Sequence, residues 1–209
     1  MRQRMPLRDE AYALLREWIE NGALPRGRMT SENRLCERLG MSRTPVRAAL
    51  QRLELEGFLR IVPKRGILIL PASLERVGNA LDLAAAMLLF AVEQSRRLRL
   101  APLAEAAKAG RERLARLGDD DPPERFAEAE RIAFTAIAAA VRNAELDAAL
   151  ALQLRRLDWD RSALRRWRAP YLRQTRATLD GLLEAAARLA PDAGQRVLDY
   201  FHDLKRHWN

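Results

Sequence analysis

Two short helical segments joined by a tight glycine turn are the feature that most constrains the fold. Residues 32–39 have the pattern of a helix that begins after Ser31 and stops at Gly40. A second segment, residues 44–56, follows Ser42 and stops at Gly57. Serine is a preferred residue before a helix, and glycine is a preferred residue after one. The pair therefore predicts a helix-turn-helix.

The flanking segments extend this unit on both sides. Residues 7–21 form an amphipathic pattern that predicts an earlier helix, and Leu24-Pro25-Arg26-Gly27 is a turn signature. The apolar face of that first helix consists of Leu7, Ala11, Leu14, Leu15, Trp18 and Ile19. After the second short helix, residues 58–62 and 67–70 flank the turn Pro63-Lys64-Arg65-Gly66, which predicts a β-hairpin. A hairpin directly after a helix-turn-helix is a wing, with Lys64 and Arg65 at its tip.

The basic charge of the chain is concentrated in this first segment. The 209 residues contain 37 Lys and Arg against 28 Asp and Glu, a formal net charge of +9. Residues 1–72 alone carry 14 basic and 8 acidic side chains. An excess of positive charge on a small unit with this pattern points to nucleic acid as a partner. We expect residues 1–72 to bind double-stranded DNA.

Several other classes of protein are excluded by what the sequence lacks. Cys36 is the only cysteine, so no disulfide framework forms within the chain, and we expect it to behave as a small apolar residue. The nucleotide-binding, hydrolase and metalloprotease motifs are absent, so we do not expect an enzyme. The apolar runs 83–92 and 132–141 are shorter than the ~20 residues that span a bilayer. No apolar leader occurs near Met1, so we expect a cytoplasmic protein.

The first segment resembles the winged helix-turn-helix of GntR-type bacterial transcription regulators over roughly residues 7 to 70. The run Ser42-Arg43-Thr44-Pro45-Val46-Arg47, with an Arg65-Gly66 wing at the expected distance, carries the resemblance. The remaining matching positions are Ile19, Gly22, Leu24, Pro25, Gly27, Ser31, Glu32, Leu39, Gly40, Ala49, Leu50, Leu53 and Gly57. The resemblance implies a homodimeric transcription regulator, with a repressor as our first expectation, that reads a short palindromic operator.

The resemblance and the residue chemistry together give the expected DNA contacts. At the start of a recognition helix Arg43 can donate two hydrogen bonds to guanine, while Ser42 and Thr44 can bind phosphate. The matching family positions of Arg43, Thr44, Arg47 and Gly66 contact DNA. Many relatives also use an arginine of the preceding helix, where this chain has Asn33 with Arg34 beside it. We expect nine residues at the DNA interface: Asn33, Arg34, Ser42, Arg43, Thr44, Arg47, Lys64, Arg65 and Gly66.

Residues 73–209 predict an all-α bundle, which makes the whole chain mainly α. The expected helices are residues 74–100, 102–117, 122–142, 144–168, 170–190 and 191–208. Asp121 is expected to cap the third of these, with Pro122 at its first position. The length and helix count resemble the FCD effector domain of FadR-like GntR regulators. That resemblance implies dimerisation and binding of a small-molecule effector.

The metal site of many FCD domains is not preserved in the sequence. Those domains use one Asp and three His, the first two spaced i and i+4 on one helix. Here the corresponding pairs are Glu130 with Phe134, or Arg131 with Thr135. Neither pair combines a carboxylate with an imidazole, so we expect the metal site to be absent or altered and no cofactor to be required.

The effector pocket is expected inside the bundle, where inward-facing arginines could bind an organic anion. Candidates for effector binding are Arg97, Arg131, Arg176, Asp180 and His202, with Asp180 and His202 near positions of family ligands. Alternatively, the arginines lie on solvated faces of their helices, and His202 has a role in the core or at an interface. A helical domain that has lost ligand response and serves only dimerisation is the alternative function. The arginine-rich stretch 154–168, with two tryptophans, is a candidate for a second nucleic-acid surface or for ordinary packing.

Overall fold

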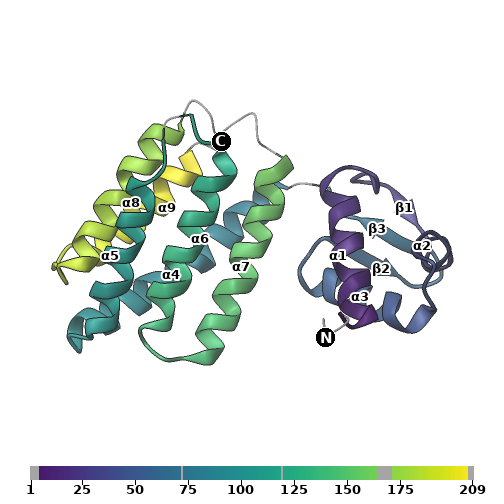
Figure 1. Ribbon diagram of the computed structural model, residues 1–209, viewed down its shortest axis with the longest axis horizontal. Coiled ribbons are helices and arrows are strands. Elements are labelled where there is room, and N and C mark those ends of the chain that lie inside the picture. The colour runs from purple at the N-terminus through teal and green to yellow at the C-terminus, as the bar shows by residue number, and fades with distance from the viewer. Residues whose placement is uncertain (1–4, 72, 119, 164–170, 207–209) are drawn as a thin grey trace. The chain divides into compact units, whose positions relative to one another are not determined.

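The chain folds into two compact units, residues Met1–Ser73 and Leu74–Asn209. The computed structural model describes residues 5–71, 73–118, 120–163 and 171–206, with the side chains of 74 and 158–163 not described. Figure 1 shows the elements of each unit. We call the first unit the winged unit and the second the helical unit, and each is described by itself.

The winged unit combines three helices with a small antiparallel sheet. Its elements in chain order are α1 (Leu7–Glu20), β1 (Met29–Thr30), α2 (Glu32–Leu39), α3 (Arg43–Leu55), β2 (Leu59–Val62) and β3 (Gly66–Ile69). The strand order is β1-β3-β2, and both pairings are antiparallel. The mainly helical fold with a winged helix-turn-helix is therefore confirmed. Strand β1 was not predicted, because two residues after a turn carry no strand periodicity.

The core of the winged unit lies between α1 and α3. Ala11, Leu15 and Ile19 of α1 are buried at four-residue spacing, as the sequence pattern predicted. They face the buried side of α3, which consists of Val46, Ala49, Leu50 and Leu53. Leu7 does not join them: half of its side chain is exposed, because it stands at the first turn of α1, beyond the reach of α3.

A buried tyrosine–glutamate pair also connects α1 to the end of α3. The Tyr12 hydroxyl donates to the Glu56 carboxylate at 2.6 Å. Burial, and then this hydrogen bond, raise the pKa of Tyr12, so the hydroxyl remains the donor. The Arg52 guanidinium lies 3.8 Å from the centre of the Tyr12 ring and 3.6 Å from the Asp9 carboxylate. Arg52 thus holds α3 against α1.

The turn between α2 and α3 has the geometry that its sequence predicts. The Ser31 hydroxyl accepts the backbone N–H of Arg34 and caps α2, and Gly40 ends α2 in the left-handed conformation with φ 63°. Glycine adopts this conformation without steric cost. Ser42 precedes α3, but its side chain makes no capping hydrogen bond. The two short helices are consequently connected within three residues.

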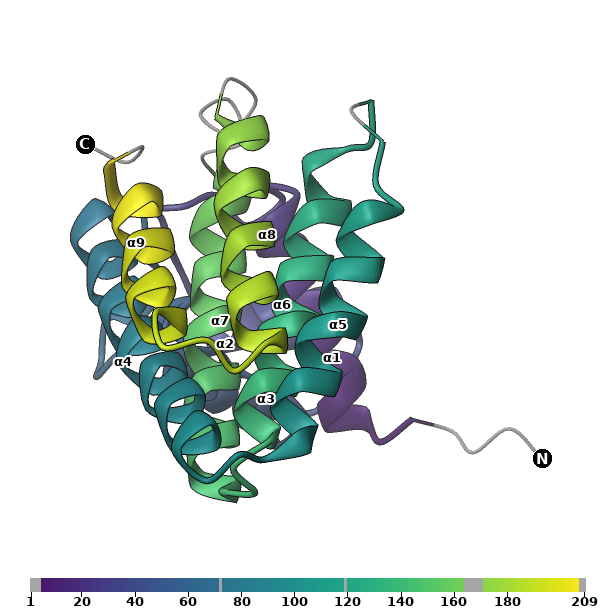
Figure 2. The same cartoon turned by 90° about the vertical axis from the view of Figure 1, so that its left-hand side faces the viewer.

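In its described residues the helical unit has six helices, which form a closed ring of neighbours. They are α4 (Leu74–Arg97), α5 (Ala101–Ala115), α6 (Pro123–Ala139), α7 (Ala144–Ala163), α8 (Leu172–Ala187) and α9 (Ala193–Arg206). Around the ring, α4 contacts α9, α9 contacts α8, α8 contacts α5, α5 contacts α6, α6 contacts α7, and α7 returns to α4. Figure 2 shows this unit from the side on which α4, α5, α8 and α9 are seen.

Helices α4 and α7 begin where predicted, and the other described helix ends differ from the predicted ends by one to three residues. Helix α4 ends at Arg97 rather than at residue 100, and α9 begins at Ala193 rather than at 191. Pro122 is the residue before α6, and Pro123 takes the first helical position, one residue later than predicted. Asp121 does not cap α6 as predicted, because no side chain caps this helix. Its carboxylate instead accepts the backbone N–H of the preceding Gly118 at 2.8 Å and the Arg125 guanidinium at 2.7 Å. The expected end of the fourth helix lies outside the described residues.

The centre of the helical unit is filled by a polar pair and aromatic rings. The Tyr200 hydroxyl donates to the Glu130 carboxylate, and both side chains are almost fully buried. The ring of Phe134 lies 5.6 Å from the rings of both Tyr200 and Phe201. Glu130 and Phe134 are one of the two pairs that the FCD resemblance aligns with the first two metal ligands.

Helix α4 is the most apolar long helix among the described residues. The 23 residues Glu75–Arg97 reach a mean hydropathy of 1.3 in one window, enough to cross a membrane by length and composition. The uninterrupted apolar run within this helix is still residues 83–92, because Asp82 and Glu93 bound it. Core helices of folded bundles satisfy the same test, and Leu81, Leu88 and Val92 are buried in this one. Only 44% of that window is buried, so much of α4 remains exposed.

Candidate nucleic-acid interface

The start of α3 presents the candidate base-reading residues. Ser42, Arg43 and Thr44 are exposed, while Pro45 is half-buried and Val46 is buried. The first N–H groups of any helix lack partners within the helix and carry partial positive charge. Because the Ser42 side chain does not cap α3, this end can receive an anion such as a DNA phosphate. The geometry here follows from the short turn after α2.

Arg47 lies one turn beyond Arg43 on α3, but it is held by α2. Its guanidinium donates to the two carboxylate oxygens of Glu32, with hydrogen bonds of 2.8 to 3.2 Å. These hydrogen bonds raise the pKa of Arg47. More than half of the Arg47 side chain remains exposed. Glu32 therefore fixes the orientation of Arg47, a contact that the sequence reasoning did not foresee.

The remaining expected contacts lie on α2 and on the wing. Asn33 and Arg34 are exposed in the first turn of α2. Lys64 and Arg65 are exposed at the tip of the β2–β3 hairpin, where the Arg65 N–H donates to the Val62 carbonyl at 3.0 Å. Lys64 has a positive φ of 60°, as a tight turn requires. The tip thus holds two cations away from the core.

Gly66 has a structural reason to be glycine. Its φ is 111°, and a Cβ placed on it would lie 2.4 Å from the Thr30 carbonyl oxygen. Strand β1 approaches β3 at this point, so any side chain would push the sheet apart. The start of strand β3 therefore requires a glycine at position 66, independently of any contact that the Gly66 backbone makes with DNA.

Several relatives share this N-terminal architecture. The model of the bacterial regulatory proteins of the gntR family matches residues 7–69. A stretch of 70 residues is 41% identical to an HTH-type transcriptional regulator from the TAR-I ttuE-ttuC' intergenic region of Agrobacterium vitis, covering 32% of this chain and 41% of that relative. Another, of 73 residues, is 37% identical to an HTH-type regulator in an unstable DNA locus of Streptomyces ambofaciens, covering 35% and 31%. Over residues 7–69 the winged unit is therefore similar to the GntR family.

The GntR likeness covers less than half of the length of those curated relatives. Solved structures extend the likeness in fold to the whole chain. A GntR transcriptional regulator from Rhodococcus sp. RHA1 matches with a TM-score of 0.66 and 21% identity, over 96% of each chain. McbR/YncC of E. coli matches with a TM-score of 0.61 and 21% identity, over 95% of this chain and 94% of that one. At these identities the likeness establishes the shared fold.

In the helical unit that follows the GntR winged unit, the structure separates the five candidate effector residues. The side chains of Arg97, Arg131 and His202 are exposed, so the inward placement predicted for them was wrong. Each stands on the outer side of its helix, because the inner positions of α4, α6 and α9 are taken by Ala, Leu, Phe and Tyr. Arg176 and Asp180 are half-buried on α8 and line one pocket.

The metal site of many FCD domains needs one Asp and three His as ligands. Within the parts of the chain that the structure describes, no three His, Cys, Asp or Glu side chains gather as metal ligands. Glu130 faces the Tyr200 hydroxyl, and aromatic rings occupy the neighbouring space. The residues present do not fit the carboxylate and imidazole set of FCD domains. Most of the side chains in the stretch 154–168 lie outside the described residues.

Proposed function

We propose that the chain is a sequence-specific DNA-binding transcription regulator of the GntR type, acting in the cytoplasm as a repressor. The observation that carries this proposal is the set of exposed residues at the start of α3, in a unit matched by the GntR family. The basic excess of the first 72 residues and the whole-chain fold likeness to GntR regulators support it.

In this proposal α3 lies in the major groove with its N-terminal turn toward the base edges. Arg43 donates two hydrogen bonds to a guanine, and Ser42 and Thr44 contact phosphate. Arg47, oriented by Glu32, contacts a second base or phosphate. Lys64 and Arg65 at the wing tip contact the DNA backbone or the minor groove. The protein backbone at Gly66 makes a contact beside them. Asn33 and Arg34 of α2 complete the interface.

A homodimer would present two such surfaces to a short palindrome. The exposed apolar face of α4 supports a second copy as the partner. Leu83 and Phe90 are each about half exposed on this face, with the exposed Ala86 between them. We call Leu83, Ala86 and Phe90 the α4 face. Solvent-exposed apolar residues at three- and four-residue spacing are typical of a helix that packs against another.

The charges at the two ends of α4 fit an antiparallel pair of copies. Glu75 is exposed in the first turn, and Arg97 is exposed in the last. Pairing two α4 helices about a two-fold axis near Ala86 would set Glu75 of each copy near Arg97 of the other. The small Ala86 side chain would let the helices approach closely, and Leu83 would pack near the other Phe90. Opposite charges at an interface favour this register.

We further propose that a small molecule bound in the helical unit controls the affinity for the operator. Its binding would shift the balance between two arrangements of the DNA-binding units in the dimer. The pocket that contains Arg176 and Asp180 supports this part. The alternative is a helical unit that serves only dimerisation, and the aromatic filling around Glu130 favours it. A small molecule that changes operator affinity would favour effector control over the dimerisation-only alternative.

Selection from a random duplex pool tests the proposed function. The full chain should enrich a short inverted repeat at moderate salt, and Arg43→Ala should lose the enrichment. Recovery of unenriched DNA by both proteins would contradict it and reduce the winged unit to a phosphate-binding module. Binding to the selected duplex should also weaken steeply with salt, as contacts to phosphate release counterions.

A further inference from the structure

Strand β2 leads into the wing tip, and it lies at an edge of the sheet. In the described part of the chain the strand order is β1-β3-β2, so β3 pairs with one side of β2 only. On β2 the Ile61 backbone N–H donates to the Glu54 carboxylate of α3, with 2.6 Å between the nitrogen and the oxygen. A side chain of α3 thus satisfies a backbone group that an edge strand would otherwise leave to water or to another chain.

Glu54 lies on the same side of α3 as the residues proposed to read bases. It follows Arg43 by 11 positions, and because an α-helix turns by ~100° per residue, the two are ~20° apart around the helix. Arg47, four positions after Arg43, is ~40° from it. Along the helix axis Glu54 lies ~16 Å from Arg43. The Glu54–Ile61 hydrogen bond therefore connects the far end of this side of α3 to the strand that carries the wing.

This hydrogen bond acts on the outer half of β2. At the base of the strand, the N–H of the buried Phe58 donates to the Leu53 carbonyl at 2.9 Å. Further out, Ile61 and Val62 are only half-buried, and Lys64 follows Ile61 by three residues. A segment with less buried apolar surface is less firmly fixed by packing. A hydrogen bond to α3 therefore has a larger share in placing the wing tip.

The negative charge of Glu54 is by itself unfavourable for DNA binding. The residue is half-buried, and a carboxylate on this side of α3 repels phosphate. A carboxylate also accepts a backbone N–H about twice as strongly as a neutral acceptor does. Charge alone predicts that removal of Glu54 strengthens DNA binding, whereas loss of the hydrogen bond frees the wing and weakens it. The two effects have opposite signs, so an experiment can separate them.

We propose that Glu54 is a positioning residue for DNA binding. It holds the wing tip where Lys64 and Arg65 meet the duplex while α3 lies in the major groove, and it acts through its hydrogen bond to Ile61. Glu54 itself contacts neither base nor phosphate. The inference rests on the proposed regulator function, and it adds to that function a residue outside the nine expected DNA contacts.

Two substitutions of Glu54 in the full chain separate its charge from its hydrogen bond. Glu54→Ala removes both and should weaken binding to the selected duplex roughly three- to tenfold. Glu54→Gln removes the charge but keeps an oxygen that can accept the Ile61 N–H, so it should bind at least as tightly as the unaltered chain. Glu17→Ala, which removes an exposed acid of α1, controls for net charge and should also bind at least as tightly. Equal affinities of Glu54→Ala and Glu54→Gln would overturn the proposal.

A wing-tip variant, Lys64→Gln with Arg65→Gln, tests whether Glu54 acts through the tip. Each lost phosphate contact makes the slope of log affinity against log salt less steep by about 0.9. Glu54→Ala should therefore reduce the steepness by about one to two, as the wing-tip variant does. Added to the wing-tip variant, Glu54→Ala should weaken binding less than about twofold further. Fully additive losses would show that Glu54 acts elsewhere and would overturn the proposal.

A third comparison separates positioning from general stability. Tyr12→Phe removes a different hydrogen bond of the winged unit and leaves the wing unaltered. At a temperature where circular dichroism shows each variant to be folded, Tyr12→Phe should keep the affinity and salt slope of the unaltered chain. Hydrogen exchange of the Ile61 amide should be faster in Glu54→Ala and unchanged in Glu54→Gln. An equal loss of affinity in Tyr12→Phe and Glu54→Ala, or unchanged Ile61 exchange in Glu54→Ala, would contradict the positioning role. Glu54→Asp, which keeps the charge on a side chain one methylene shorter, takes the place of Glu54→Ala if that variant does not fold.

Failure of this inference is distinguishable from failure of the proposed function. If the unaltered chain selects an inverted repeat but Glu54→Ala binds it as Glu54→Gln does, the regulator stands and the positioning role is rejected. If the unaltered chain selects no sequence, the proposed function fails, and random duplex replaces the selected one in the same tests. Wing contacts to phosphate need no particular sequence, so Glu54→Ala should have the shallower salt slope there too. Equal slopes of the two variants on random duplex would then reject the positioning role as well.

Discussion

The winged unit and the helical unit differ in how their candidate functional residues are brought together. In the winged unit Ser42, Arg43 and Thr44 are consecutive, and one helix start exposes all three. In the helical unit Arg111 of α5 meets Asp180 of α8, 69 positions later in the chain. Local sequence signals determine the first arrangement, whereas the packing of distant helices determines the second.

The two units also expose different kinds of surface. The winged unit buries the apolar side of α3 and exposes cations at its helix start and hairpin tip. The helical unit leaves the apolar α4 face exposed. We therefore expect polar substitutions on the winged unit to change DNA recognition and those on the α4 face to change assembly. The following predictions test this division, in order of decreasing effect.

Introducing charge on the α4 face should have the largest effect. The double substitution Leu83→Glu with Phe90→Glu would set four carboxylates across the proposed two-fold axis, and the dimer should dissociate. Operator affinity should then fall by about a hundredfold or more, because each half-site would be bound independently. Light scattering after gel filtration gives the mass of the particle, and duplex titration gives the affinity.

The matched control for this prediction lies in the other unit. Leu55 of α3 is 72% exposed, and Leu55→Glu should leave the mass of the particle unchanged. If the double variant has the same mass as the unaltered chain, the α4 face is not the dimer interface.

An intermediate effect is expected at the two buried tyrosine–glutamate pairs, one in each unit. Tyr12→Phe and Tyr200→Phe each remove a hydroxyl that donates to a buried carboxylate. A buried carboxylate that loses its hydrogen-bond donor lowers the free energy of unfolding by about 1–3 kcal/mol. Hydrogen exchange should locate the loss in the winged unit for Tyr12→Phe and in the helical unit for Tyr200→Phe. Equal loss of protection across both units in either variant would contradict the division.

The smallest effect is expected from Glu32→Gln, which changes recognition without changing assembly. Glu32 orients Arg47 and places a negative charge near the DNA surface. Its neutralisation should strengthen binding to random duplex and weaken discrimination, so the ratio of selected to random affinity should fall by roughly two- to fivefold. Glu37→Gln, on an exposed position of the same helix, is the control. An unchanged ratio would show that Arg47 does not depend on Glu32.

The fold of the winged unit could be predicted because its sequence marks each helix end with a residue of definite conformational preference. Ser31 and Gly40 bound α2 where predicted, and the three-residue connection to α3 follows. Strand β1 escaped prediction, because it depends on pairing with β3. The Glu32–Arg47 contact also escaped, although an acid and an arginine 15 positions apart on adjoining helices could have suggested it.

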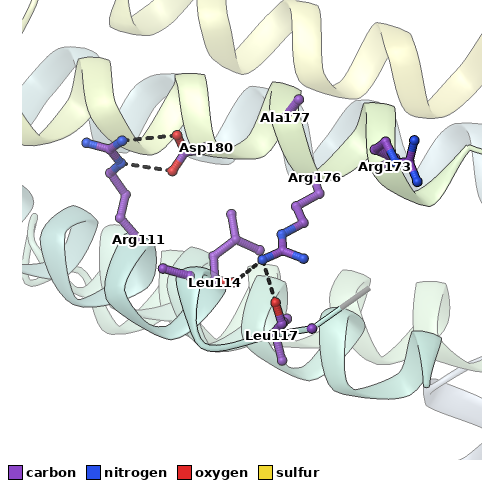
Figure 3. A pocket seen from close by; sticks show the side chains of 9 residues that line it. Arg111, Leu114, Leu117, Arg173, Arg176, Ala177 and Asp180 are labelled. Atoms are coloured by element: carbon purple, nitrogen blue, oxygen red, sulfur yellow. Dashed lines mark hydrogen bonds and ion pairs between the residues drawn. The ribbon is translucent and has the colours of Figure 1, made fainter. Parts of the chain in front are cut away.

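The pocket of the helical unit could not be predicted, because alanine- and leucine-rich helices give little information about their rotation. Arg97, Arg131 and Arg176 looked equivalent in sequence, yet Arg97 and Arg131 are exposed whereas Arg176 is half-buried and lines the pocket between α5 and α8 (Figure 3). Arg176 donates to the backbone carbonyls of Leu114 in α5 and of Leu117 just after it, contacts that no side-chain pattern reveals. The exposed placement of His202 is a further consequence of helix rotation.

The most direct test of the central claim compares Arg43→Ala with the unaltered full chain at one salt concentration. The affinity of each protein is measured for the selected duplex and for its scrambled version. If Arg43 reads a base, its replacement should cost ~1–3 kcal/mol on the selected duplex and much less on the scrambled one. An equal loss on both duplexes would make Arg43 a phosphate contact and would contradict sequence reading by the start of α3.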